Sequence, residues 1–350
     1  MRFSLIICVY NVARFIEKSL TDVLRQGFHE IIIVDDGSTD AITPAICDRI
    51  AASDSRINVI HKPNGGLGSA RNAGIDAATG DYITFYDVDD ILHDDALATI
   101  RQVLGKKPVD ILMFGYNEIN PTLNLSTPFS FSDMTLTGDE IRENFVEHLS
   151  GTRFNNGFAW NKVYRLSFLN DHGLRFGNQA IQQDMPFNLR AYRHAQSISL
   201  CSNILYDYYV YNTGNNRSRF IADRLAIYRS IYKEFIDLLN EWNITDRRME
   251  TYICRKFLND VISAMTYNLF HKDCPMNCNE KREYISEVLC SEDVKQASKS
   301  LSSYGYKYTD SQERRYFQAI AKCDTVAFLR ARRLSEIRHF FSRIYHFILR

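Results

Sequence analysis

The chain has 350 residues, enough for one large domain and a smaller one. Hydrophobic residues make up 45% and charged residues 24%, the balance of a globular protein rather than a disordered one. The 42 basic and 42 acidic residues give a formal net charge of zero, which excludes overall attraction to nucleic acid or another polyanion.

Membrane-spanning, secreted and zinc-binding classes also lack support in the sequence. No run reaches the roughly 18 apolar residues of a membrane span, and no signal peptide is recognisable. The eight cysteines contain no Cys-x-x-Cys pair, and no second ligand pair follows Cys274 and Cys278 at zinc spacing. We therefore expect scattered reduced thiols, as in a cytosolic protein.

The first 120 residues alternate between strand and helix patterns. Apolar runs predict buried strands at 3–9, 31–34, 57–60, 82–86 and 110–116. Helical spacing predicts helices between them, the first capped by Asn11 and the others near 44–51, 69–78 and 94–104. This alternation predicts an α/β fold with a doubly wound, mostly parallel sheet. Ligands of such sheets bind beyond the carboxyl ends of the strands.

The rest of the chain is more helical. The segment 137–140 reads as a capping box that opens a helix to about Leu149. Residues 158–212 have mixed, strand-rich character, and the pattern is helical from Arg219 onward. We predict a domain over 1–215, a mainly helical region over 216–329 and a basic helix over 330–350.

Three acidic features follow predicted strands or precede a helix. Asp87, Asp89 and Asp90 lie within four residues. They suit Mg²⁺ or Mn²⁺ with positions open for phosphate oxygens, and the alternative is a solvated loop before the next helix. The cluster 35–40 offers a carboxylate for the imide N–H of uracil, or forms an Asx turn. Asp184 precedes Pro186 at a helix start, where an N-cap is the simpler interpretation.

Four segments taken together resemble glycosyltransferase family 2, the inverting bacterial enzymes with the GT-A fold. They are Ser4-Leu-Ile-Ile-Cys-Val-Tyr-Asn11, Ile31-Ile-Ile-Val-Asp-Asp-Gly-Ser-Thr-Asp40, Gly68-Ser-Ala-Arg-Asn-Ala-Gly-Ile75 and Gly80-Asp-Tyr-Ile-Thr-Phe-Tyr-Asp-Val-Asp-Asp90. Each is common alone, but their order and spacing are specific. The resemblance is dense over 3–95 and looser to about 215, where Trp160-Asn-Lys-Val-Tyr-Arg165 and Asp184 carry it.

The resemblance implies a role for each matching position. A uridine-binding wall is implied for Cys8, Val9, Tyr10 and Asp36, and contacts to the base and ribose for Gly66 to Arg71. Asp87 and Asp89 take the places of the family's Asp-x-Asp, so the resemblance implies donor contacts for Asp87 and Val88 and metal ligation for Asp89 and Asp87. Asp184 falls where the family keeps its catalytic base.

The implied function is inverting transfer of a sugar from a nucleoside diphosphate sugar, a UDP-sugar with Mn²⁺ or Mg²⁺. The implied acceptor is a hydroxyl of a bacterial surface glycan or lipid-linked saccharide, such as lipopolysaccharide, capsule or O-antigen. Two positions depart from the family's pattern. Gln183 replaces the Glu that normally precedes the base, and Cys8 stands where Pro or Thr is common. Gln183 keeps open the alternative of a catalytically degenerate member that serves as a binding or assembly subunit.

The segment 330–350 carries six Arg against one Glu. Its apolar residues recur at helical spacing, at Leu334, Ile337, Phe341, Ile344 and Ile348. A basic amphipathic helix is typical of membrane-surface attachment, although a helix packed on the catalytic domain would read similarly. We expect a cytoplasmic protein on the inner face of the bacterial inner membrane, with no nucleic-acid partner.

Two other enzyme classes fit less well. A sugar nucleotidyltransferase needs a Gly-rich, basic loop directly after the first strand, and Tyr10-Asn11-Val12 does not supply one. An Asp-x-Asp phosphatase needs its motif after the first strand, whereas this chain carries it after the fourth.

Overall fold

The computed structural model describes residues 1–150, 157–211 and 219–348, with side chains except those of Lys18, Asp22 and 339–348. The chain divides into two units, Met1–Asn215 and Asn216–Arg350. The division falls within 212–218, outside the described residues. Each unit is described by itself.

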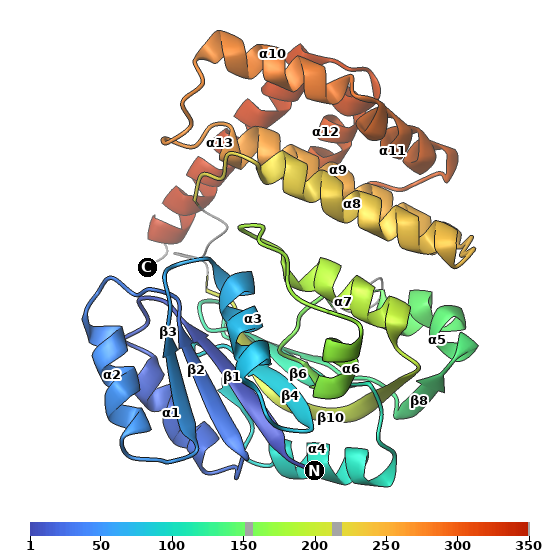
Figure 1. The fold of residues 1–350 in the computed structure, drawn as a ribbon. Coiled ribbons are helices and arrows are strands. Elements are labelled where there is room, and N and C mark those ends of the chain that lie inside the picture. The colour runs from blue at the N-terminus through green and yellow to red at the C-terminus, as the bar shows by residue number, and fades with distance from the viewer. Residues whose placement is uncertain (151–156, 212–218, 349–350) are drawn as a thin grey trace. The chain divides into compact units, whose positions relative to one another are not determined.

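The first unit is an α/β domain (Figure 1). Its strands are β1 (Phe3–Val9), β2 (Glu30–Asp35), β3 (Ile57–His61), β4 (Tyr82–Tyr86), β5 (Ile91–Leu92), β6 (Ile111–Asn120), β7 (Leu125–Phe129), β8 (Met134–Thr137), β9 (Lys162–Arg165) and β10 (Ser197–Tyr209). Its helices are α1 (Ile16–Leu24), α2 (Ile42–Ala51), α3 (Leu67–Ala77), α4 (Ala96–Lys106), α5 (Asp139–Glu143), the π-helical turn η1 (Phe145–Leu149), α6 (Leu166–Asp171) and α7 (Asp184–His194).

The strands of the described residues form one ten-stranded sheet in the order β3-β2-β1-β4-β9-β6-β10-β5, with β7 beside β6 and β8 beside β10. The half containing β3, β2, β1 and β4 is parallel throughout, and β6 and β10 are also parallel. Antiparallel β9 joins these two parts by pairing with both β4 and β6. The predicted α/β class is therefore confirmed, with antiparallel strands completing the sheet.

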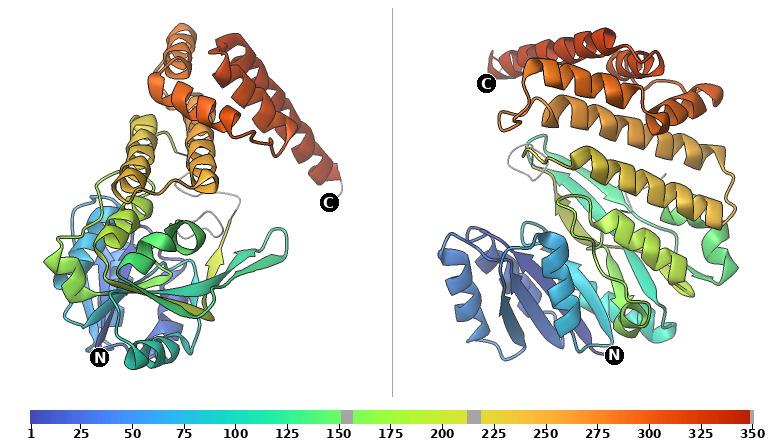
Figure 2. Two further views of the ribbon diagram at one scale, coloured as in Figure 1. Left: turned by 90° about the vertical axis from the view of Figure 1, so that its right-hand side faces the viewer. Right: turned by 45° about the horizontal axis from the view of Figure 1, so that its top comes forward.

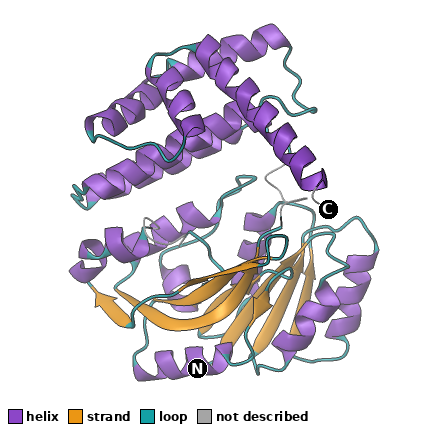
Figure 3. Ribbon diagram, turned by 180° about the vertical axis from the view of Figure 1, so that it is seen from behind, coloured by secondary structure: helices purple, strands orange, loops and turns teal. Residues whose placement is uncertain are grey.

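The strand order reverses direction at β1, and this sets where helices pack. The chain moves outward from β1 to β2 and β3 and then returns across β1 to β4. Right-handed crossovers therefore place α3 on the opposite face from α1 and α2. Figure 1 shows α3, α6 and α7 in front of the sheet, and Figure 3 shows the sheet from behind, where α4 lies. Both faces are covered, so β1 is buried at every position except Cys8, which is partly exposed.

Two local predictions were wrong for identifiable reasons. Asn11 does not cap α1, whose N-cap is Phe15. Asn11 has a left-handed backbone (φ 55°), and its side-chain oxygen accepts hydrogen bonds from the N–H groups of Thr39 and Asp40. The predicted helix to Leu149 is broken into α5 and η1, with Gly138 as the N-cap. Only half of the expected capping box forms, because Glu140 accepts bonds from the N–H and hydroxyl of Thr137, which itself caps nothing.

The second unit is helical. Its elements are α8 (Arg224–Glu241), α9 (Arg247–Ser263), the π-helical turn η3 (Ala264–Asn268), α10 (Cys278–Leu289), α11 (Glu292–Ser303), α12 (Ser311–Ala321) and α13 (Thr325–Ile348). Figure 2 shows α8 beside α9 and α12 beside α13, pairs that also contact each other in the structure. No helix in the described part of the chain is long and apolar enough to cross a membrane.

The predicted basic helix over 330–350 belongs to α13, which starts earlier, at Thr325. Its first turns pack into the helical unit, since Phe328 and Ala331 are buried. Leu334 and Ile337 are 43% and 51% exposed, so the apolar stripe emerges from the unit at this point. The side chains of Phe341, Ile344 and Ile348, and residues 349–350, lie outside the described part.

Candidate active site

The reversal of strand order at β1 indicates where a ligand binds. In open α/β sheets the crevice for a ligand lies at such a switch point, beyond the carboxyl ends of the strands. Here those ends belong to β1 and β4, which pair in parallel. The segments that follow them are Tyr10-Asn11 and the acidic turn, defined as Asp87 to Asp90.

The residues expected on the nucleotide at this edge differ in what they can offer. The side chains of Val9 and Val88 are 2% and 6% exposed, so only their backbones can reach a ligand. Tyr10 is 47% exposed and presents its ring to solvent. Cys8 is partly exposed, and burial of its thiol raises the pKa to about 12. The thiol therefore stays protonated at neutral pH and is no nucleophile.

Asp36 holds the turn between β3 and α3. One carboxylate oxygen accepts bonds from the Lys62 ammonium at 2.7 Å and the N–H of Gly65 at 3.0 Å. The other accepts from the N–H of Gly66 at 2.7 Å. Gly66 has φ +83°, a conformation that favours glycine. Since each carboxylate oxygen has two lone pairs, the oxygen bound to Gly66 can accept one further N–H.

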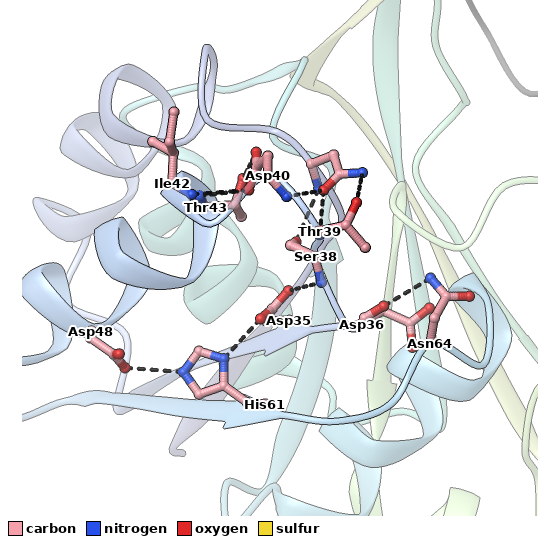
Figure 4. A network of polar contacts seen from close by, with 11 residues as sticks. Asp35, Asp36, Ser38, Thr39, Asp40, Ile42, Thr43, Asp48, His61 and Asn64 are labelled. Atoms are coloured by element: carbon pink, nitrogen blue, oxygen red, sulfur yellow. Dashed lines mark hydrogen bonds and ion pairs between the residues drawn. The ribbon is translucent and has the colours of Figure 1, made fainter.

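A polar network beside Asp36 fixes the ends of β1 and β2 (Figure 4). Asp35 accepts a bond from the N–H of Ser38 at 2.9 Å and lies 2.8 Å from Nδ1 of His61. Asp40 precedes Ala41, the N-cap of α2, and accepts bonds from the N–H and hydroxyl of Thr43 in the first turn of that helix. The Asx-turn interpretation of this cluster therefore holds for Asp35 and Asp40, whereas Asp36 binds Lys62 and the N–H groups of Gly65 and Gly66.

Arg71 connects the acidic turn to the predicted base. It lies on α3, its side chain is 2% exposed, and its guanidinium donates a hydrogen bond to Asp184. Its second terminal nitrogen lies 3.6 Å from a carboxylate oxygen of Asp87. The rings of Phe85 and Phe176 flank it at 5.5 and 5.1 Å from their centroids. Arg71, expected near the base and ribose, thus lies between two carboxylates 97 positions apart in sequence (184 − 87).

Asp184 is the first residue of α7 and its side chain is 18% exposed. One oxygen binds Arg71, and the other accepts a hydrogen bond from the N–H of Ala159 at 2.9 Å. A helix N-terminus also favours a negative charge. Two of roughly four acceptor positions are used, so the carboxylate can still accept a proton from a bound hydroxyl.

The preceding residue, Gln183, points elsewhere. It is 6% exposed, and its amide donates a hydrogen bond to the carbonyl of Gln179 at 2.7 Å. A glutamate could not make this bond when ionised, because a carboxylate has no hydrogen to donate. The Gln at this position is therefore integrated into the local turn.

Asn188, which lies one helical turn after Asp184, was not predicted from the sequence as a site residue. Its amide donates hydrogen bonds to the carbonyls of Gly157 and Phe158, at 2.9 and 3.0 Å, and its oxygen accepts one from the Tyr164 hydroxyl. Asp184 and Asn188 thus hold the same short backbone segment from two positions on α7. The i, i+4 spacing of Asp184 and Asn188 on one helix was the available signal.

Lys162 lies beneath the same segment and is fully buried. Its ammonium donates hydrogen bonds to the carbonyl of Phe158 and to the side chain of Asn161. Burial lowers the pKa of Lys162 to about 7, although the negative charge of Asp184 opposes this shift. The lysine therefore titrates near neutral pH in the folded protein.

The acidic turn is fixed by a clamp that the sequence analysis also missed. The Tyr206 hydroxyl accepts a hydrogen bond from the N–H of Asp87 at 3.2 Å and donates one to Asp90 at 2.9 Å. The other oxygen of Asp90 accepts from the N–H of Tyr209 at 2.8 Å. Burial, with the charges of Asp87 and Asp89, raises the pKa of Asp90 to about 9. Asp90 is therefore a structural member of the turn.

The two other carboxylates of the turn remain accessible. Asp87 is 30% exposed and Asp89 is exposed. Burial raises the pKa of Asp87 to about 6, with Arg71 lowering it and the carboxylates of Asp89 and Asp184 raising it. Among the described residues no group of three or more His, Cys, Asp or Glu is arranged around a common metal position. Two carboxylates nevertheless suit Mg²⁺ or Mn²⁺ when phosphate oxygens complete the shell.

The α/β fold that carries the acidic turn at its switch point is shared by known structures. A crystal structure of Staphylococcus aureus TarS residues 1–349 with UDP-GlcNAc matches with a TM-score of 0.66 at 20% identity, covering 96% of this chain and 92% of that chain. The model of "Glycosyl transferase family 2" matches residues 4–169. The uncharacterized glycosyltransferase EpsJ of Bacillus subtilis is 30% identical over 304 residues, 84% of this chain and 85% of its own.

A further relative is the poly(ribitol-phosphate) beta-N-acetylglucosaminyltransferase TarS of Staphylococcus aureus strain MW2. It is 23% identical over 298 residues, 82% of this chain and 50% of that protein. The chain belongs to glycosyltransferase family 2, so the family predicted from four short motifs is confirmed. It is a glycosyltransferase with the fold of the TarS structure.

Proposed function

We propose that the chain is an inverting transferase that moves a sugar from a UDP-sugar to an acceptor hydroxyl, with Asp184 as the base. The observation that carries this proposal is the shared contact of Arg71 with Asp87 and Asp184. It brings the acidic turn and a partly exposed carboxylate together at the switch point of the sheet. A single displacement needs the base and the leaving group held at the same sugar, on opposite faces of its anomeric carbon.

The nucleotide would lie along the carboxyl ends of β1 and β2. The free acceptor position of Asp36 suits the imide N–H of uracil, and the backbones of Cys8, Val9 and Tyr10 would form the wall beside it. Gly66 lets the backbone approach the ribose closely, while Asp87 and Val88 would meet the ribose and diphosphate. A bound UDP-GlcNAc in the matching TarS structure supports a uridine nucleotide.

A divalent cation, Mn²⁺ or Mg²⁺, would be held by Asp89 and Asp87, and when bound it would neutralise charge on the leaving diphosphate. Both carboxylates are accessible, which fits this role. Arg71 contributes a fixed positive charge beside Asp87 without exposure to bulk water.

Asp184 would take the proton of the acceptor hydroxyl as its oxygen attacks the anomeric carbon from the face opposite the diphosphate. Ala159, Arg71 and the start of α7 fix the orientation of the carboxylate for this step. One displacement inverts the anomeric centre, and the proton ends on Asp184. General-base catalysis of this kind contributes on the order of 10²–10⁴-fold.

The acceptor would be a bacterial surface glycan or lipid-linked saccharide at the inner face of the inner membrane. Support comes from α13, where Arg330, Arg333 and Arg338 are exposed beside the exposed Leu334 and Ile337. Cationic and apolar side chains together suit an anionic membrane surface. This contact would be peripheral.

Replacing Asp184 by Asn tests the proposal. The amide keeps the size of the side chain but cannot take a proton, so transfer should fall by about 10²–10⁴-fold, measured as UDP release from a panel of UDP-sugars with Mn²⁺. UDP affinity, measured by calorimetry, should stay within about threefold of the wild-type value, a difference below 1 kcal/mol. Wild-type turnover in Asp184→Asn would exclude Asp184 as the base. Absence of UDP binding by the wild-type chain would exclude the donor.

A further inference from the structure

Four aromatic side chains form a continuous stack beside the base, here called the aromatic platform: Phe158, Trp160, Tyr206 and Tyr208. The ring of Trp160 stacks on Phe158 at 4.7 Å and on Tyr206 at 4.4 Å, with interplanar angles of 22° and 13°. Tyr208 stacks on Trp160 at 5.2 Å and meets Phe158 at 5.2 Å. Tyr206 and Tyr208 share a face of β10 because strand side chains alternate.

The platform links the two halves of the proposed site. Phe158 precedes Ala159, whose N–H binds Asp184. At the other end, the Tyr206 hydroxyl binds the N–H of Asp87 and the carboxylate of Asp90. The platform is therefore joined, through Ala159 and Asp87, to both the proposed base and the acidic turn.

Burial of the platform is uneven. Trp160 and Tyr206 are 2% and 0% exposed and form its buried support. Phe158 and Tyr208 are partly exposed, so they form the surface that a ligand can touch. Partly exposed aromatic rings backed by a rigid stack present a flat apolar surface at little entropic cost, because the rings are already fixed.

We infer that Phe158 and Tyr208 form the binding surface for the acceptor, and that this acceptor presents a pyranose ring. A pyranose has one face of C–H groups that packs on an aromatic ring, while its hydroxyls stay at the edge, where one can reach Asp184. An acyclic polyol phosphate has no such face, and its phosphates call for Arg or Lys instead. This inference rests on the proposed function for the position of the base and deepens it by naming the acceptor class.

The stack contains its own reporter. The chain has two tryptophans, Trp160 and Trp242, so a Trp242→Phe variant reports only on the platform through the fluorescence of Trp160. Methyl glycosides of glucose, galactose, mannose and N-acetylglucosamine are titrated with UDP and Mn²⁺ present, and D-ribitol 5-phosphate is titrated in parallel. Calorimetric titration of the unmodified chain provides a second measurement of the same affinities.

At least one glycoside should bind, and Phe158→Leu should weaken it about tenfold, the equivalent of losing about one ring contact. Phe158→Tyr should restore the affinity because it restores the ring. Phe168→Leu makes the same chemical change on α6, where the ring contacts His172, and should leave glycoside affinity at the wild-type value. Thermal unfolding of each variant checks that it is folded.

Equal glycoside affinity in Phe158→Leu and Phe168→Leu would overturn the inference. So would wild-type protein that binds no glycoside, or that binds D-ribitol 5-phosphate more tightly than every glycoside. UDP is titrated separately. If UDP fails to bind, the proposed donor is wrong. The glycoside titration still tests whether the platform binds a pyranose, because the fluorescence of Trp160 reports binding at the platform directly.

Discussion

Removal of the Tyr206 hydroxyl should loosen the acidic turn. In Tyr206→Phe the N–H of Asp87 loses its 3.2 Å partner and Asp90 loses its 2.9 Å donor, both beside a fully buried ring. A buried polar group left unpaired costs about 1–3 kcal/mol. The free energy of unfolding should therefore fall by about 2 kcal/mol. The affinity for UDP with Mn²⁺ should fall about tenfold, since each 1.4 kcal/mol of turn ordering is tenfold in affinity.

The chain offers a matched control in Tyr192, which is also buried. Its hydroxyl contacts the sulfur of Met113 at 3.7 Å, a weak acceptor. Tyr192→Phe removes the same atom and should change stability by less than about 1 kcal/mol, with UDP affinity preserved. Urea unfolding and calorimetric titration measure both quantities. Equal stability of the two variants would refute the clamp, and unchanged UDP affinity in a destabilised Tyr206→Phe would refute its link to the nucleotide site.

The remaining predictions concern residues around Asp184, the proposed base. The folded-state pKa of Lys162 is about 7 and an unfolded lysine has a pKa near 10.4, so the unfolded state binds more protons between these values. Stability therefore gains up to about 1.4 kcal/mol per pH unit as pH rises through this window. The free energy of unfolding of Lys162→Met, measured across pH 7–10, should lack this rise with pH. The control variant Lys107→Met, which changes an exposed lysine, should keep it. Gln183→Glu should lower the free energy of unfolding by about 1–3 kcal/mol, seen as a lower urea midpoint, because it places a carboxylate against the carbonyl of Gln179. An unchanged midpoint would contradict the observed hydrogen bond. Asn188→Ala should lower kcat while changing the KM for the UDP-sugar less, because it frees the backbone segment that orients Asp184. Equal changes in kcat and KM would argue against Asn188 as a positioning residue.

The strands beside the site could be predicted because they are buried on both faces. The predicted bounds of β1 and β4 match the structure, since continuous apolar runs have one interpretation when a turn signal closes them. The strands β7 and β8 have no such apolar run, because most of their residues are exposed or partly exposed. β8 pairs with β10, which lies far along the chain, and β7 pairs with β6 across an irregular turn. Their pairing depends on tertiary contacts that local patterns do not contain.

The acidic turn, Asp184 and Arg71 could be proposed from motif order, but the contacts that hold them could not. Arg71 lies 113 positions from Asp184, and Tyr206 lies 119 positions from Asp87. Such contacts are set by the packing of α3 and β10 against the switch point. Asn11 shows how a local pattern can mislead. Its residue type suits a helix cap, but its backbone is left-handed and its side chain binds the neighbouring turn at Thr39 instead.

One guanidinium, that of Arg71, contacts both the acidic turn and Asp184, and this sharing links substitutions at the two places. A substitution at Asp87 changes the charge that Arg71 balances, and with it the environment of Asp184. Energies of residues that share a partner are not additive. The effects of substitutions at Asp87 and Asp184 are therefore expected to be non-additive, because both carboxylates contact the same guanidinium.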